Sequence, residues 1–75
     1  MPYIKIKAYP KDEKIKQSVI DKINQLFLDE WGCPQSAISI SYETVEPDDW
    51  QVNVAENDIK NDLDKMYILD GQKKY

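Results

Sequence analysis

This chain cannot form an intrachain disulfide or a structural zinc site, which limits the ways in which so short a sequence can stabilise a fold. It has 75 residues with a single cysteine, Cys33, and no histidine. A domain of this size buries only about 60% of the surface of its unfolded chain, so its own core is marginal. Such domains usually gain further stability from disulfides, a metal ion or partner subunits. One cysteine forms no intrachain disulfide, and a lone cysteine among scattered carboxylates does not suit zinc. We therefore expect self-association.

A strand, a helix and a second strand follow one another in the first part of the chain. Apolar and polar side chains alternate over residues 3–9 and again over residues 37–45, which predicts two half-buried strands. Between them, apolar residues recur at helical spacing over residues 15–31. Asp12 is the expected N-cap of that helix, and Gly32 is expected to end it. A helix between two strands leaves room for a parallel, right-handed crossover, so the pattern predicts an α/β fold built on a β-α-β unit.

The residues after position 45 give a weaker pattern. Pro47 begins either a turn or a helix, and residues 50–54 fit an extended or a helical segment. Asn57 is the expected N-cap of a short helix. Its inward-facing side chains are expected to be those of Ile59, Leu63, Met66 and Tyr67. Asp70-Gly71 predicts a turn, after which residues 72–75 either fray or pair with a partner.

The two faces of the expected sheet differ in character. The long helix would cover one face, whereas the other carries lysines, tyrosines and serines and is too polar for a dry core. That polar face either meets water or lines a polar cavity between subunits. No linker or internal repeat interrupts the chain, so residues 1–75 are expected to form a single domain.

The composition excludes several classes of function. Fourteen acidic against ten basic residues give a net charge of −4, which argues against a nucleic-acid partner. Every basic residue is a lysine, so bidentate binding of a carboxylate or phosphate by arginine is excluded. No stretch is long and apolar enough for a membrane span. No glycine-rich phosphate loop is present, and we expect no cofactor and no metal. The free thiol and the lack of an apolar export signal lead us to expect a cytoplasmic protein.

Pro2 is the one residue with a clear route to chemistry. A proline in this position allows Met1 to be trimmed, which leaves a secondary amine at the end of the chain; while Met1 is present, that nitrogen is an amide. An ordinary α-amine has a pKa of about 7.7–8.0, and burial lowers the pKa because it disfavours the charged form. The ring fixes φ, and an alternating strand follows without a spacer. Such an amine could move a proton between the oxygen and carbon of an enol.

The ordered set of motifs resembles the 4-oxalocrotonate tautomerase family. The matching features are Pro2, the strand of residues 3–9, the Asp12-Glu13 helix start, Pro34, and the segments 36–40 and 46–51. They span roughly residues 2–54 in the family's order. The Ile-Ser-Ile strand, the Pro-Asp-Asp-Trp-Gln segment and the longer C-terminal helix are most similar to the dimeric, phenylpyruvate-tautomerase-like branch.

This resemblance implies a protomer, a site and an assembly. The protomer would be a β-α-β unit with an extra short C-terminal helix, dimerising into a four-stranded sheet with helices on one face; hexamers built from three dimers also occur in the family. Pro2 matches the family's catalytic base, and Trp50 matches an aromatic residue that walls the pocket. Lys11 and Ser39 fall where the best-known members have two arginines that bind substrate. The implied function is a cofactor-independent tautomerase acting on a small enol or 2-keto acid.

Two alternatives stay open for the residues that replace those arginines. Without them, a monoacid enol with an aromatic tail fits Lys11 and Trp50 better than a dicarboxylate does. The competing hypothesis is a catalytically inactive binding or scaffolding module with the tautomerase fold. Each residue also has a plain structural interpretation: packing for Trp50, a solvated cation for Lys11 and a polar interface for Ser39.

Overall fold

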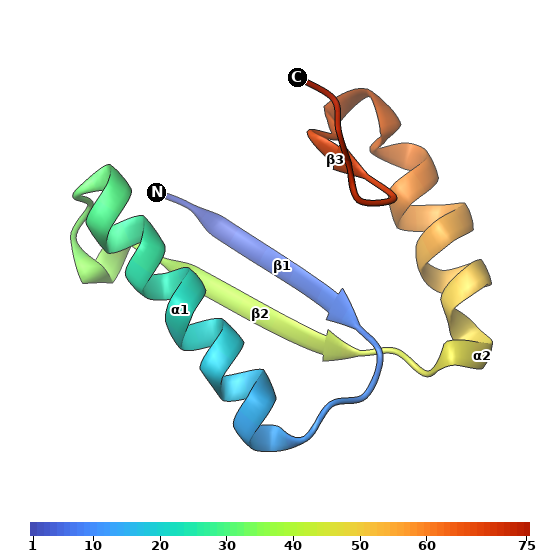
Figure 1. Cartoon of the computed structure of the whole chain (residues 1–75), viewed down its shortest axis with the longest axis horizontal. Helices are drawn as coiled ribbons and strands as arrows, with labels where there is room; N and C mark the ends of the chain where they lie inside the picture. The colour runs from blue at the N-terminus through green and yellow to red at the C-terminus, as the bar shows by residue number, and fades with distance from the viewer. The chain divides into compact units, whose positions relative to one another are not determined.

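A computed structural model describes all residues, 1–75, and divides them into two compact units, residues 1–45 and residues 46–75 (Figure 1). The first unit contains strand β1 (Tyr3–Ala8), helix α1 (Glu13–Trp31), the 3₁₀ turn η1 (Gln35–Ala37) and strand β2 (Ser39–Thr44). The second unit contains helix α2 (Pro47–Trp50), its continuation as the π-helix η2 (Gln51–Ile59), the 3₁₀ turn η3 (Leu63–Lys65), and the short strands β3 (Ile68–Leu69) and β4 (Gln72–Lys73). The single domain expected for the whole chain stays a prediction.

β1 and β2 form a parallel pair, and α1 crosses one face of it (Figure 1). The register runs from Tyr3 opposite Ser39 to Ala8 opposite Thr44. A parallel pair needs a crossover connection, which α1 supplies. The predicted α/β class and β-α-β unit are therefore confirmed.

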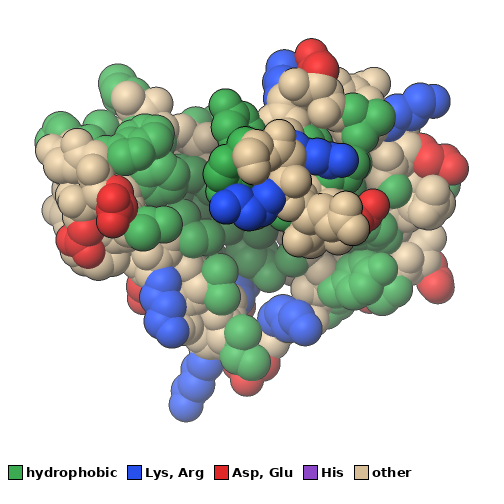
Figure 2. All heavy atoms as spheres, turned by 45° about the horizontal axis from the view of Figure 1, so that its top comes forward, with side chains coloured by type: hydrophobic (Ala, Val, Ile, Leu, Met, Phe, Trp, Pro, Cys, Tyr) green, Lys and Arg blue, Asp and Glu red, His purple; other side chains and the backbone are tan.

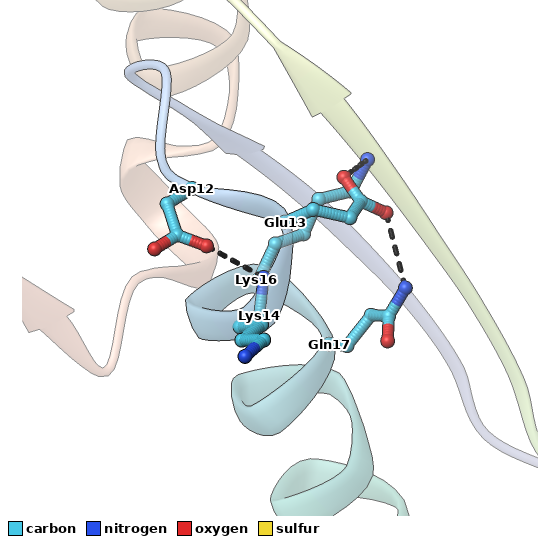
Figure 3. Close-up of polar contacts among 5 residues, drawn as sticks. All are labelled: Asp12, Glu13, Lys14, Lys16 and Gln17. Atoms are coloured by element: carbon cyan, nitrogen blue, oxygen red, sulfur yellow. Dashed lines mark hydrogen bonds and ion pairs between the residues drawn. The ribbon is translucent and has the colours of Figure 1, made fainter.

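Both ends of α1 follow from local sequence. The Asp12 carboxylate accepts a hydrogen bond from the backbone N–H of Lys14 at 2.7 Å, as Figure 3 shows, and so caps the first turn. At the other end, Gly32 adopts a left-handed φ of 60° and donates its N–H to the carbonyl of Leu28 at 3.2 Å. A side chain with a Cβ is disfavoured in that conformation. Both predicted helix ends are confirmed.

Loss of the Asp12 cap is expected to destabilise the protein measurably. The Asp12→Ala variant leaves the first-turn N–H groups without their side-chain acceptor, which typically costs about 1 kcal/mol. In a domain of this size that corresponds to a melting temperature lower by about 4–8 °C. Thermal unfolding followed by circular dichroism measures this shift. The Asp12→Asn variant retains an acceptor and is the control; an equal drop in both variants would contradict the capping argument.

β2 is shorter than the alternation suggested. Instead of residues 37–45, it covers Ser39–Thr44 and follows the η1 turn. In that turn the N–H of Ala37 donates to the carbonyl of Pro34 at 2.9 Å. A pattern of period two does not distinguish a tight turn in front of a strand from the strand itself, because both carry mixed polar and apolar residues. At the far end, the N–H of Val45 still donates to the carbonyl of Ala8, at 2.9 Å.

The predicted helix cap at Asn57 is wrong. Asn57 lies inside a helical segment that starts at Pro47, passes through α2 and η2, and extends to Asn61. Proline suits the first turn of a helix because its fixed φ is already helical and its missing N–H needs no partner there. The helical alternative for residues 50–54 is therefore the correct one. Of the four side chains expected to face inward, Ile59 and Met66 are half-buried, whereas Leu63 and Tyr67 are exposed.

The chain ends in a small hairpin. Asp70 and Gly71 both have positive φ, 51° and 77°, and connect β3 to β4 in antiparallel register, with Ile68 opposite Lys73. Asp and Gly are suited to these conformations, so the predicted turn is confirmed. Gln72 and Lys73 pair with β3 of the same chain.

Few hydrophobic residues are fully buried. Val45 and Val54, each 4% exposed, are the buried hydrophobic residues, and no side chain is fully enclosed. Figure 2 shows hydrophobic side chains over much of the visible face. The large exposed ones are Met1, Tyr3, Tyr9, Ile15, Val19, Leu26, Trp31, Val52, Leu63, Tyr67, Ile68 and Tyr75. The core of one protomer is thus as small as the chain length predicts.

Candidate functional site

Pro2 and Ser39 lie together at the start of the parallel pair. Pro2 directly precedes β1, and its carbonyl accepts a hydrogen bond from the backbone N–H of Ser39 at 3.2 Å. Pro2 itself is half-buried, whereas Met1 is 98% exposed and accessible to a peptidase. The end of the chain is therefore held by a strand rather than left as a loose tail.

The segment in front of β2 brings Ser39 to this place. The η1 turn is closed by a hydrogen bond from the N–H of Ile38 to the carbonyl of Gln35 at 3.3 Å. Ile38 is already extended, with φ −95° and ψ 129°, so the chain leaves the turn as a strand. Ser39 then falls opposite Tyr3, and its side chain is exposed. Two of the four predicted site residues are thus neighbours.

Lys11 lies far from Pro2 in the same protomer. It is in the loop after β1, exposed, and separated from Pro2 by the whole strand. Six residues of strand span about 20 Å, which a lysine side chain cannot bridge. If Lys11 acts at a Pro2 amine, that amine belongs to a second copy of the chain.

Trp50 belongs to the second compact unit. It is the last residue of α2 and is half-buried. Glu46 precedes the helix in extended conformation, and its carbonyl accepts the N–H of Asp49 at 2.9 Å. The switch from α- to π-helix follows directly at Gln51.

The polar face of the sheet carries an interaction that the sequence did not predict. The hydroxyl groups of Tyr3 and Ser41 lie 3.2 Å apart and form a hydrogen bond across the two strands. On the opposite face, the Lys16 ammonium of α1 lies 4.9 Å from the ring centre of Tyr42. Since Ser41 and Tyr42 are consecutive strand residues, their side chains point to opposite faces. Tyr3 and Ser41 therefore lie on the face that α1 leaves open.

Alternation along the strands was the available signal for this open face. It placed tyrosine, lysine and serine side chains there, but it does not give the diagonal pairing of Tyr3 with Ser41, which depends on the register of the two strands.

No three His, Cys, Asp or Glu side chains are grouped so that they could hold a metal ion. The Cys33 thiol lies 3.8 Å from the carbonyl oxygen of Phe27 in a half-buried position, in keeping with a packing role. None of the helices has the length and apolar character needed to span a membrane.

The resemblance to the tautomerases implies a small β-α-β protomer with a proline directly before its first strand. The fold described above has this architecture and therefore fits that class of protein. Two bacterial proteins named tautomerase PptA are similar to the chain. That of Cronobacter sakazakii (strain ATCC BAA-894) is 26% identical over 68 residues, which cover 88% of this chain and 90% of the relative. That of Enterobacter sp. (strain 638) is 25% identical over 73 residues, covering 95% and 96%.

No established family profile matches the chain. The two relatives nevertheless align over almost its whole length, and both are named tautomerases. The predicted resemblance to the tautomerase superfamily is therefore confirmed, with the similarity extending beyond the segments that first indicated it.

Proposed function

We propose that this protein is a cofactor-independent tautomerase that moves a proton between the enol and keto forms of a 2-keto acid, with the Pro2 amine as its base. The observation that carries the proposal is the position of Pro2, which precedes β1 directly and is tied to β2 through the N–H of Ser39. The similarity to two tautomerases over most of the chain supports the same conclusion.

The reaction needs only one group that first accepts and then donates a proton. After removal of Met1, the neutral ring nitrogen accepts the proton of the enol hydroxyl. The electron pair of that O–H bond forms the keto C=O bond, and the pair of the carbon–carbon double bond takes the proton back from the ammonium at C3. Ser39 and Lys11 hold the carboxylate or enol oxygen, and Trp50 excludes water.

This arrangement needs more than one copy of the chain. Lys11 and Pro2 lie at opposite ends of β1, so the lysine of one protomer serves the proline of another. We propose a homodimer with a four-stranded sheet and the helices on one face; the alternative assembly is a hexamer of three such dimers. The free thiol of Cys33 suits a reducing, cytoplasmic setting.

The absence of arginine narrows the range of substrates that the proposed site could bind. Lysine attracts a carboxylate but does not bind it through two parallel hydrogen bonds as arginine does. An aromatic side chain such as Trp50 provides a flat apolar wall. These residues favour a monoacid enol with an aromatic tail over a dicarboxylate.

Protein lacking Met1 is expected to accelerate the ketonisation of phenylenolpyruvate well above the rate in buffer. The decay of the enol absorbance in the ultraviolet follows the reaction, with the same buffer without protein as the reference. A rate equal to that of buffer would rule out this substrate.

A second function, binding or scaffolding without catalysis, is favoured by the replacement of both family arginines by Lys11 and Ser39. Retention of Met1 in native cells, which acylates the ring nitrogen, would strongly favour this second function. Intact mass spectrometry of the native protein measures it.

A further inference from the structure

The open face of the sheet presents a compact polar group beside Pro2. The register places Tyr3 opposite Ser39 and Lys5 opposite Ser41. Residues opposite each other in a parallel pair point to the same face, so these four side chains are neighbours on the face that α1 does not cover. Together they contribute three hydroxyl groups and one ammonium group.

Lys5 is the cation of β1 that lies nearest to Pro2. Its side chain is exposed and makes no ion pair. The next charged residues on this face, Lys7 and Glu43, lie opposite each other two positions further along the strands. The end of the face next to Pro2 is therefore positively charged. The nearest carboxylate of the sheet on this face is that of Glu43, which lies further from Pro2 than Lys5 does.

The hydrogen bond between Tyr3 and Ser41 fixes the tyrosine side chain at the edge of this polar cluster. Tyr3 is 66% exposed, yet its hydroxyl lies 3.2 Å from that of Ser41. This bond links the two strands diagonally, since Tyr3 is opposite Ser39 in the register. A ligand at this end of the sheet thus meets two hydroxyl groups, those of Tyr3 and Ser41, that already orient each other.

The distances suit a ligand that spans from Pro2 to Lys5. Three residues of strand separate their Cα atoms by about 10 Å. An extended lysine stem reaches about 6 Å from its Cα. Where the stem leans back along β1, the ammonium comes closer to Pro2 than the Cα atoms are to each other, and a 2-keto acid whose C3 lies at the ring nitrogen fits between the two groups.

We propose that Lys5, with the hydroxyl groups of Ser39 and Ser41, binds the substrate carboxylate within the same protomer as Pro2. The choice of a carboxylate as the ligand rests on the proposed tautomerase function. The assignment supplies, from β1 itself, the cation that Lys11 of the same protomer is too distant to provide. Lys5 becomes a specificity-determining residue that selects acids over neutral enols.

The test measures binding and does not depend on turnover. Chain lacking Met1 and labelled with ¹⁵N is titrated with 3-phenylpropanoate, a carboxylate that cannot tautomerise, and with its neutral analogue 3-phenylpropanamide. The Lys5→Gln variant is expected to raise the dissociation constant of the carboxylate about fivefold and to leave that of the amide unchanged. The Lys5→Arg variant keeps the charge and offers two parallel hydrogen bonds, so it is expected to bind the carboxylate at least as tightly as the wild type.

Lys22→Gln is the matched control, because it removes the same charge from an exposed position on α1. Equal carboxylate binding by the wild type and Lys5→Gln would overturn the assignment, as would equal weakening in Lys22→Gln or no binding by the wild type. If the charge-dependent binding is present but phenylenolpyruvate is not turned over, the proposed function fails for this substrate and the binding site stands.

Discussion

Acetylation of the Pro2 nitrogen is expected to reduce the tautomerase rate by about 10²–10⁴-fold, the usual contribution of a general acid–base group. The lone pair of an acetylated nitrogen is delocalised into the amide bond and accepts no proton. The chain of residues 2–75 is short enough for chemical synthesis with Pro2 either free or acetylated. The two products then differ only at this nitrogen, and the ketonisation rates of phenylenolpyruvate compare them directly.

A third synthetic chain distinguishes the contribution of the amine from that of the proline ring. Pro2→Ala with a free N-terminus keeps a basic amine but loses the ring that fixes φ, so its rate is expected to fall between the other two. Circular dichroism and sedimentation of all three chains check that the fold and assembly are unchanged. An acetylated chain as active as the free one would show that Pro2 is not the base.

The first compact unit could be predicted because its signals are local. The alternation of Ile4 and Ile6 with lysines, the Asp12 cap and the left-handed Gly32 each act within a few residues of themselves. Such preferences agree with one another here, so the order and type of the elements follow from the sequence. The exact start of β2 did not, since the η1 turn depends on backbone hydrogen bonds that the pattern does not encode.

The helical region after Pro47 shows where local reasoning fails. Asn57 is a good N-cap residue, and this favoured a helix starting there. The chain between Pro47 and Asn57 has no proline or glycine to stop a helix that has already begun, so the segment continues through it. A cap residue marks a helix start only where the preceding residues are not helical.

The candidate site divides in the same way. Pro2 lies beside Ser39 because β1 starts one residue after Pro2 and β2 starts at Ser39. The parallel pair was predicted from the sequence, whereas this neighbour relation depends on the start of β2, which was not. Motif matching also selected Lys11, but a motif gives an order along the chain and no distance in space. The length of β1 separates Lys11 from Pro2 of the same protomer, and the register places Lys5 and Ser41 on the same face as Tyr3 and Ser39.

Thermal stability is expected to depend strongly on protein concentration. A protomer whose buried hydrophobic residues are Val45 and Val54 has little apolar core of its own, while Leu26, Trp31 and other large side chains are exposed. If a second copy covers part of that surface, folding and association are one equilibrium. A hundredfold rise in concentration then adds about 2.7 kcal/mol per mole of dimer. For two chains of this length, that raises the melting temperature by about 5–10 °C.

Differential scanning calorimetry over such a concentration series measures the shift, and sedimentation velocity on the same samples gives the number of copies. A monomer would show one melting temperature at all concentrations, because its unfolding does not change the number of particles. That result would also remove the basis for Lys11 at the site, since Lys11 and Pro2 of one protomer are separated by the full length of β1. Lys5 needs no partner to lie near Pro2, so a monomer leaves Lys5 as the candidate for binding the carboxylate, whereas an oligomer keeps both lysines.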